Sequence, residues 1–111
     1  MISRIWHGWT TRGNADAYER LVQAEVFRGI REMNIPGLKG IHLLRRDAGE
    51  EIEFVTIMWF ESLGDVKAFQ GEDYERAYVP EEAQKLLARY DLRSAHYDVI
   101  ALPDAESVGP E

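Results

Sequence analysis

The hydrophobic pattern of this chain is densest at residues 52–60, which read IEFVTIMWF. A short run rich in β-branched and aromatic side chains predicts a β-strand rather than a helix. Only Glu53 and Thr56 are polar, and they fall on opposite faces of the strand, so both faces are expected to be buried. The helices of a small chain can cover one face. We therefore expect a second copy to cover the other, in a homodimer formed through the face of the sheet.

The rest of the chain alternates between strand-like and helix-like patterns. Further strands are expected at 2–10, 38–46 and 92–101, and helices at 15–33, between Ser62 and Gly71, and from Pro80 to Tyr90. Asn14 and Ser62 are the expected N-caps, since short polar side chains accept hydrogen bonds from the first helical turn. Gly49 suits the left-handed backbone of a hairpin turn at 47–49.

The order of these elements is β-α-β-β-α-β, the ferredoxin-like pattern of the α+β class. Adjacent hairpin strands and a right-handed crossover predict an antiparallel sheet with the strand order 4-1-3-2. All helices are then expected on one face of the sheet. With 111 residues, the chain is expected to form one domain at 1–102, followed by a polar C-terminal tail at 103–111.

Composition and motifs remove several classes of function. The absence of cysteine excludes disulfides, thiolate catalysis and zinc ribbons. A net charge of −7, with the acidic residues spread along the chain, argues against a nucleic-acid partner. No apolar run approaches the ~20 residues of a membrane span, so no membrane partner is expected and the expected location is cytoplasmic. No GxGxxG, P-loop, HExxH or GxSxG motif supports a nucleotide cofactor, metalloprotease chemistry or α/β-hydrolase chemistry.

Four segments of the sequence resemble one known family. They read RIWHGWTT near the N-terminus, IPGLKGIHLLRR at 35–46, EFVTIMWFES at 53–62, and AHYDV at 95–99. Together they look like the antibiotic biosynthesis monooxygenase (ABM) family over about residues 2–101. The resemblance implies a dimeric α/β barrel of two ferredoxin-like subunits, each with a pocket between its helices and its sheet. The activities it implies are cofactor-free oxygenation of polyketide aromatic compounds, quinol oxygenation or haem degradation.

The haem-degrading branch of the family matches this chain poorly. Its tryptophan falls where Phe60 stands, its haem-ligating histidine falls near Tyr78, and its first-strand asparagine falls near Trp6 or His7. At none of these three positions does this chain have the residue of the haem-degrading branch. The resemblance therefore points away from haem degradation.

Alternation along the third strand selects candidate pocket residues. If Phe60 faces the pocket, so do Phe54 and Met58, because successive side chains of a strand point to opposite faces. Tyr74 and Tyr78 are expected at the rim of the pocket, where either hydroxyl could hydrogen-bond a phenolic substrate or simply pack against its neighbours.

By the same alignment, Arg4, Trp6 and Gly8 of the first strand face the pocket. Trp6 is then a wall for a flat substrate, and Gly8 leaves room for that substrate. The alternative for Trp6 is a purely structural role in the core or the dimer interface, since tryptophan is most often buried.

The three histidines, His7, His42 and His96, fall in three different strands. In the order 4-1-3-2 the second strand lies roughly 10 Å from the first, so one metal ion is not expected to be held by all three. His7 and His42 are expected on the dimer-facing side or near strand ends. His96 is the preferred candidate for a general base, because the pKa of histidine suits proton transfer near neutral pH.

These patterns lead to three hypotheses for function. The first is a cofactor-independent monooxygenase, in which a small phenol-, anthrone- or quinol-like compound binds in the pocket, His96 removes a proton, Arg4 stabilises the anion, and the anion reacts with dioxygen. The resemblance supplies this reaction, which needs no cofactor and no metal. The second is a non-catalytic dimeric protein of the same fold that binds a small molecule. The third is a haem-binding or haem-degrading protein.

Overall fold

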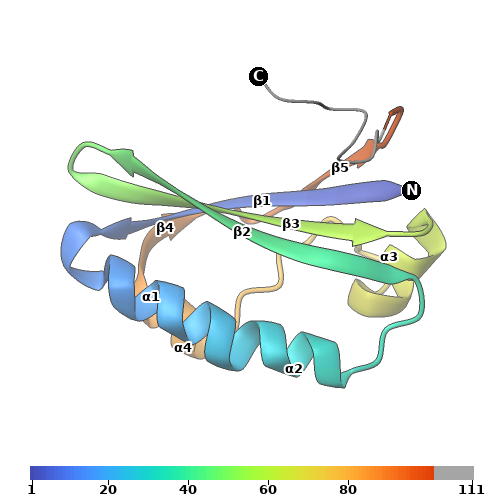
Figure 1. Ribbon diagram of the computed structural model, residues 1–111, viewed down its shortest axis with the longest axis horizontal. Coiled ribbons are helices and arrows are strands. Elements are labelled where there is room, and N and C mark those ends of the chain that lie inside the picture. The colour runs from blue at the N-terminus through green and yellow to red at the C-terminus, as the bar shows by residue number, and fades with distance from the viewer. Residues whose placement is uncertain (102–111) are drawn as a thin grey trace, which may run out of the picture.

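The computed structural model describes residues 1–101 and has an antiparallel sheet with helices on one side (Figure 1). Its strands are β1 (Ile2–Thr11), β2 (Leu38–Ala48), β3 (Glu51–Phe60), β4 (Leu87–Tyr90) and β5 (Ala95–Asp98). Their order in the sheet is β2-β3-β1-β4, and β5 also pairs with β1. The predicted ferredoxin-like fold of the α+β class is confirmed. The predicted tail at 103–111 lies outside the described residues.

One continuous helical element, called the covering helix below, connects β1 to β2. It consists of α1 (Ala15–Leu21), a π-helical turn at Val22–Val26, and α2 (Phe27–Glu32). Two short helices follow β3, namely α3 (Leu63–Gln70) and α4 (Glu81–Leu86). Within residues 1–101, no helix is both long and apolar enough to cross a membrane.

The predicted N-cap of α3 is confirmed, and the N-cap of α1 differs from the prediction in its hydrogen bonds. The hydroxyl of Ser62 accepts a hydrogen bond from the Asp65 N–H and caps α3, as predicted. Asn14 stands at the N-cap position of α1, as predicted, but its side chain accepts no hydrogen bond from the first turn of the helix. Thr11 instead caps a 3₁₀ turn at Arg12–Asn14, and the Asn14 amide donates to the Leu86 carbonyl at 3.3 Å. Asn14 thus ties the start of α1 to the end of α4.

The C-terminal part of the sheet also differs from the expectation. The helix expected to reach Tyr90 ends at Leu86, and the strand expected at 92–101 is confined to Ala95–Asp98. The physical reason lies in the length of β1. One edge of β1 pairs with β3 along its whole length. On the other edge, β5 pairs only with residues 2–5, and β4 pairs with residues 8–10. The unpaired edge of β1 therefore recruits Leu87–Tyr90 as a strand, despite the helical pattern of those residues.

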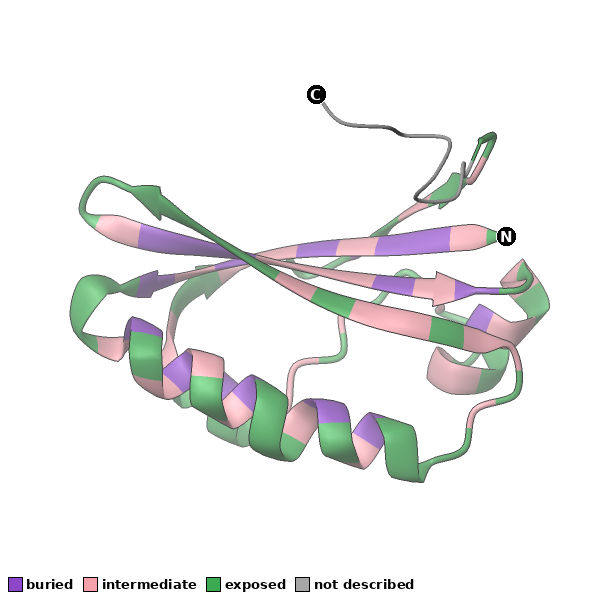
Figure 2. Ribbon diagram, in the orientation of Figure 1, coloured by how far each residue is buried: buried purple, intermediate pink, exposed green. Residues whose placement is uncertain are grey.

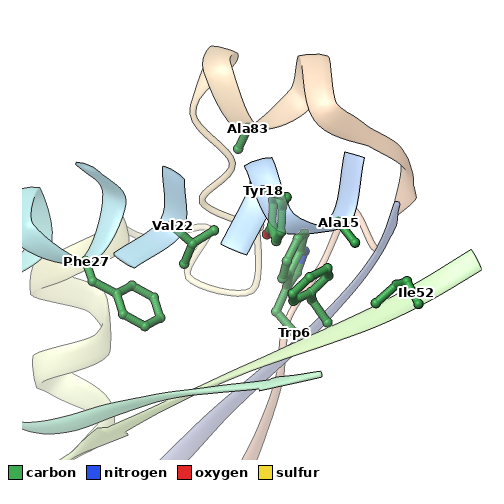
Figure 3. Close-up of a cluster of buried hydrophobic side chains, with 8 residues drawn as sticks. Trp6, Ala15, Tyr18, Val22, Phe27, Ile52 and Ala83 are labelled. Atoms are coloured by element: carbon green, nitrogen blue, oxygen red, sulfur yellow. The ribbon is translucent and has the colours of Figure 1, made fainter. Parts of the chain in front are cut away.

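The core lies between the sheet and the helices. Figure 2 shows the buried residues along the strands and on the sides of the helices that face them. Most of the core is one cluster, seen in Figure 3, and a second cluster lies beside α3. The fully buried rings are Phe54 in the first cluster and Phe60 in the second. Because opposite residues of an antiparallel pair share a face, Arg4 opposite Met58 and Trp6 opposite Thr56 face this core.

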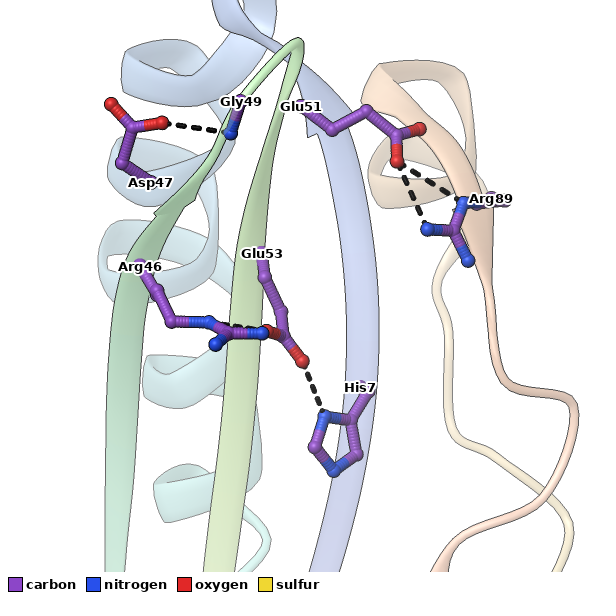
Figure 4. A network of polar contacts seen from close by, with 7 residues as sticks. All are labelled: His7, Arg46, Asp47, Gly49, Glu51, Glu53 and Arg89. Atoms are coloured by element: carbon purple, nitrogen blue, oxygen red, sulfur yellow. Dashed lines mark hydrogen bonds and ion pairs between the residues drawn. The ribbon is translucent and has the colours of Figure 1, made fainter.

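Within residues 1–101, no helix covers the other face of the sheet (Figure 1). Its alternate positions include the half-buried residues Val55, Ile57 and Trp59. Glu53 is only 7% exposed on this face. Figure 4 shows its carboxylate between Arg46, with a closest contact of 2.6 Å, and His7 at 2.8 Å. The hydrogen bond from His7, together with Arg46, holds the pKa of Glu53 below its usual range, so this buried carboxylate is kept ionised by its neighbours.

Gly37 offers a direct test of the turn that leads into β2. Its φ is +81°, and a Cβ there would lie 2.1 Å from the carboxylate of Asp65. We expect Gly37→Ala to lower the free energy of unfolding by more than about 1 kcal/mol, measured by urea denaturation.

Gly29→Ala is the matched control. No atom lies within 4 Å of its added Cβ, and Gly29 is inside α2, so this change should stabilise the protein by about 0.5–1 kcal/mol. Equal and small effects of the two substitutions would contradict the described backbone at Gly37.

Candidate functional site

A small cavity lies between the helices and the sheet. The strands β1 and β3 supply one wall, with Arg4, Trp6, Thr56 and Met58. The continuous helical element supplies the other, with Tyr18, Val22, Val26, Phe27 and Ile30. Figure 3 shows Trp6 from β1 beneath Tyr18 and Val22 from the covering helix. The segment before α4 closes the end of the cavity, with Tyr78, Val79 and Pro80, together with Ala83 and Ser94.

The local sequence explains how these walls meet. Alternation along β1 places Arg4 and Trp6 on the helix side of the sheet. In the covering helix, the π-helical turn brings Val22, Val26 and Phe27 to the cavity side together, and the Phe27 N–H bonds to the Val22 carbonyl five residues earlier. Single π-helical turns occur frequently at functional sites. This turn lies directly against the cavity.

The cavity is narrow, with a volume of about 50 Å³. A cavity that accepts a benzene ring has a volume of roughly 150 Å³. Val26, Tyr78 and Pro80 also line a depression on the outer surface, so these side chains separate the cavity from solvent and form its mouth. Tyr78 is 41% exposed. An aromatic ring therefore enters only when side chains at this mouth, Tyr78 first among them, move aside.

Arg4 is the polar centre of the cavity wall. Its side chain is almost fully buried, with 3% of the residue exposed. Its Nη2 donates to the Arg76 carbonyl at 2.7 Å, and its Nη1 donates to the Tyr74 carbonyl and contacts Nε2 of His96 at 2.9 Å. Burial lowers the pKa of Arg4 to about 10, which leaves it a cation at neutral pH. No carboxylate of the described residues forms an ion pair with it.

His96 lies behind Arg4, away from the cavity. Because an arginine N–H only donates, Nε2 of His96 is the acceptor and the proton of the neutral ring is on Nδ1. Nδ1 is buried and has no partner among the described residues. Burial, and then the charge of Arg4, lower the pKa of His96 below its usual value, against an opposing effect of Glu75. The ring therefore stays neutral at neutral pH.

Trp6 is held in place by both of its ends. Its indole N–H donates to the Asp91 carbonyl at 2.8 Å. Its six-membered ring lies over Gly8, where an added Cβ would come within 2.5 Å of it. The expectation that Gly8 leaves room for a substrate is therefore wrong, because the ring of Trp6 and the side chain of Leu87 occupy that space.

Comparison with known proteins identifies the fold. No protein-family model matches the chain, and no curated protein sequence matches it. The structure is similar to a solved structure of a provisionally assigned antibiotic biosynthesis monooxygenase from Bacillus cereus, with a TM-score of 0.64 over 94% of this chain and 97% of the other, at 18% sequence identity. The chain has the fold of that protein. The ferredoxin-like subunit fold that the sequence resemblance implied is thus confirmed by an independent comparison of structure.

The structure brings some of the sequence-predicted site residues together and separates others. Arg4, Trp6, Met58 and Tyr78 line the cavity. The remaining four predicted residues do not line it: Phe54 and Phe60 lie within the core, Tyr74 contributes its backbone carbonyl to Arg4, and His96 lies behind Arg4.

The sequence reasoning missed the helical side of the cavity. In the sequence, Tyr18, Val22, Val26 and Ile30 form an apolar stripe along the helix expected at 15–33, and such a stripe by itself does not distinguish a cavity wall from a packed core. Ser94 gave no signal. His7 and His42 are on the opposite face of the sheet from His96, and no group of three or more metal-binding side chains lies together within residues 1–101.

Arg4 should stabilise the protein as well as the site. Arg4→Met leaves the Tyr74 and Arg76 carbonyls and Nε2 of His96 without their donor. We expect the free energy of unfolding to fall by about 1–3 kcal/mol, measured by urea denaturation, and proteolysis within residues 71–80 to become faster.

Arg4→Lys, which keeps the charge but has fewer and differently placed donors, should lose less stability. The exposed Arg45, which pairs with Asp16 and Glu19, provides the control, and Arg45→Met should lose least of the three. If Arg4→Met were as stable as the wild type, the contacts of Arg4 with Tyr74, Arg76 and His96 would contribute nothing to the free energy of unfolding.

Proposed function

We propose that the chain is a member of the antibiotic biosynthesis monooxygenase family and that its cavity binds a small aromatic compound, which the protein oxidises with dioxygen without a cofactor. The observation that carries the proposal is a buried, largely apolar cavity with one cation, Arg4, in its wall. Apolar walls suit a flat ring, and a guanidinium suits a phenolic oxygen. The shared fold with a provisionally assigned monooxygenase supports the same conclusion.

The proposed reaction balances without an external reductant. A phenol loses its hydroxyl proton to solvent, a ring carbon of the anion forms a bond to dioxygen, and the terminal oxygen takes up a proton from solvent. The O–O bond then breaks as that carbon loses its hydrogen and becomes a carbonyl. One oxygen atom ends in the quinone and the other in water. All four electrons that reduce dioxygen come from the substrate.

The proposed contributions of this chain are binding, charge stabilisation and exclusion of water. Arg4 holds the substrate oxygen, where negative charge resides in the anion. Trp6 and Met58 contact the ring and orient it. The covering helix and Tyr78 close over the ring and keep bulk water from the anion.

Filling the cavity tests the proposal without removing a polar group. Ala83 lines the cavity and is 3% exposed, so Ala83→Leu should occupy the space that the ring needs. The measurement is dissolved-oxygen consumption by metal-free protein with a panel of naphthols and dihydroxyanthracenes. We expect the wild type to consume oxygen with at least one compound, and Ala83→Leu to lower kcat/KM at least about tenfold.

Ala24→Leu, at an exposed position of the covering helix, is the matched control and should retain the wild-type rate. An absence of oxygen consumption by folded protein with every compound would contradict the proposal and favour the hypothesis of a binding protein.

We also propose that the protein is a homodimer, formed through the sheet face that its own helices leave uncovered. Besides its half-buried residues, this face carries Leu44 and Tyr97, which are 49% and 57% exposed. A second copy presents the same apolar surface, so an isologous contact between two such faces would bury both. The two cavities would then lie on the outer sides of the dimer, each served by its own helices.

Light scattering after size exclusion tests the dimer at micromolar concentration. We expect twice the chain mass of 12.8 kDa for the wild type. Ile57→Glu, which places a charge in the middle of the face, should give the mass of the single chain because an interface does not tolerate an unpaired charge at its centre.

Ala24→Glu, on the helical side, should remain a dimer. A wild type with the mass of a single chain would contradict the proposal.

A further inference from the structure

We propose that the cavity binds its aromatic ligand as an oxygen anion, with Arg4 as the anion-binding group and His96 as the neutral residue that positions Arg4. The inference rests on the proposed function, because it concerns the ionic form of the ligand in the same cavity. It differs from the expectation that His96 removes the proton.

The charges of the cavity wall are the first argument. Arg4 is the only charged residue that lines the cavity within the described part of the chain, and no aspartate, glutamate or histidine lines it. Tyr18 is the most deeply buried hydroxyl group of the wall, and burial raises its pKa far above the usual value, so it does not accept a proton from a phenol. The wall therefore favours an anion and offers no base that would create one. The ligand enters ionised, or its proton leaves for solvent as it binds.

The donors of Arg4 are the second argument. A guanidinium has five N–H donors and no acceptor. Three donors are engaged within the described residues, by two backbone carbonyls and by His96. The guanidinium also lies over the ring of Phe69, with 5.7 Å between its central carbon and the ring centroid. Two donors remain without a partner among the described residues, and no carboxylate there neutralises the charge. A buried cation that is neutralised by no carboxylate is costly, and an anionic oxygen in the cavity would relieve this cost.

The contact between Arg4 and His96 is the third argument. The 2.9 Å approach requires that Nε2 of His96 be free of a proton. The charged groups that act on this ring are Arg4 from β1 and Glu75 from the segment after α3, and the ring of Tyr74 lies edge-on at 5.2 Å. Protonation of His96 would place two cations in contact and remove the acceptor. Anion binding should therefore weaken as His96 becomes protonated at acidic pH.

The experiment uses 4-nitrophenol, a single-ring phenol that ionises near neutral pH and absorbs visible light only as the phenolate. We expect bound 4-nitrophenol to show the phenolate band at a pH below the pKa of the free compound. 4-Nitroanisole has nearly the same shape and cannot ionise. We expect it to bind at least about tenfold more weakly than the phenolate, the factor that one charge-assisted hydrogen bond provides.

The variants separate the two roles. Arg4→Met should lose about tenfold in affinity for the phenolate and little for 4-nitroanisole, and Arg4→Lys should lie between it and the wild type. His96→Gln supplies an amide oxygen that can accept from Arg4, so it should bind the phenolate as the wild type does. Its affinity for the phenolate, calculated from the ionised fraction of free 4-nitrophenol at each pH, should no longer fall as His96 would titrate. His96→Ala should bind weakly at every pH. His42→Gln, on the opposite face of the sheet, should behave as the wild type.

Three outcomes would overturn the inference: a bound chromophore that remains the neutral phenol, equal affinities for 4-nitrophenol and 4-nitroanisole, or full phenolate binding by folded His96→Ala. These outcomes are independent of oxygen consumption. A protein that binds the phenolate and oxidises nothing would contradict the proposed function alone. A protein that oxidises naphthols but binds 4-nitrophenol in its neutral form would contradict this inference alone.

Discussion

The contacts of Arg4 are the interaction on which the site depends. Residues 71–80 form neither strand nor helix, and the Tyr74 and Arg76 carbonyls within them accept hydrogen bonds from Arg4. Arg4 lies on a central strand, so its side chain joins this irregular segment to the middle of the sheet. Backbone hydrogen bonds from the Ala77 N–H to Leu92 and from the Ser94 N–H to Glu75 hold the same segment from its other side. The same segment leads to Tyr78 at the mouth of the cavity. A polar group that holds the backbone in place thus also gives the cavity its charge and its closing wall.

The central part of the fold follows from sequence because its signals are local. Local signals define three of its features without reference to distant residues: the nearly continuous apolar run of β3, the glycine turn at Gly49 and the Ser62 cap. Leu87–Tyr90 shows the limit of such signals. Its residues extend the apolar spacing of a helix, but the open edge of β1 at residues 8–10 offers hydrogen bonds that a helix would leave unmade. That edge exists only once the sheet has assembled, and no local pattern reports it.

The site follows from sequence to the extent that strand alternation decides it. Arg4 and Trp6 reach the cavity because they share a face of β1, and Met58 reaches it from β3. Alternation says which side of the sheet a residue faces, but it does not say how far the helices extend over that side. Phe54 and Phe60 face the helices and lie within the packed core. The neighbours of His96 depend on two short pairings, those of β5 and of the segment at Arg76, that join residues far apart in the chain.

The π-helical turn has a consequence for the geometry of the whole covering helix. Tyr18, Val22, Val26 and Ile30 are spaced by four residues. In a regular α-helix each such step advances the direction of the side chain by about 40°, so three steps would turn Ile30 about 120° away from Tyr18. One inserted residue sets the helix back by about 100°, which cancels most of this rotation. The turn therefore acts as a phase correction, and it allows a four-residue repeat to face one sheet from end to end of the helical element.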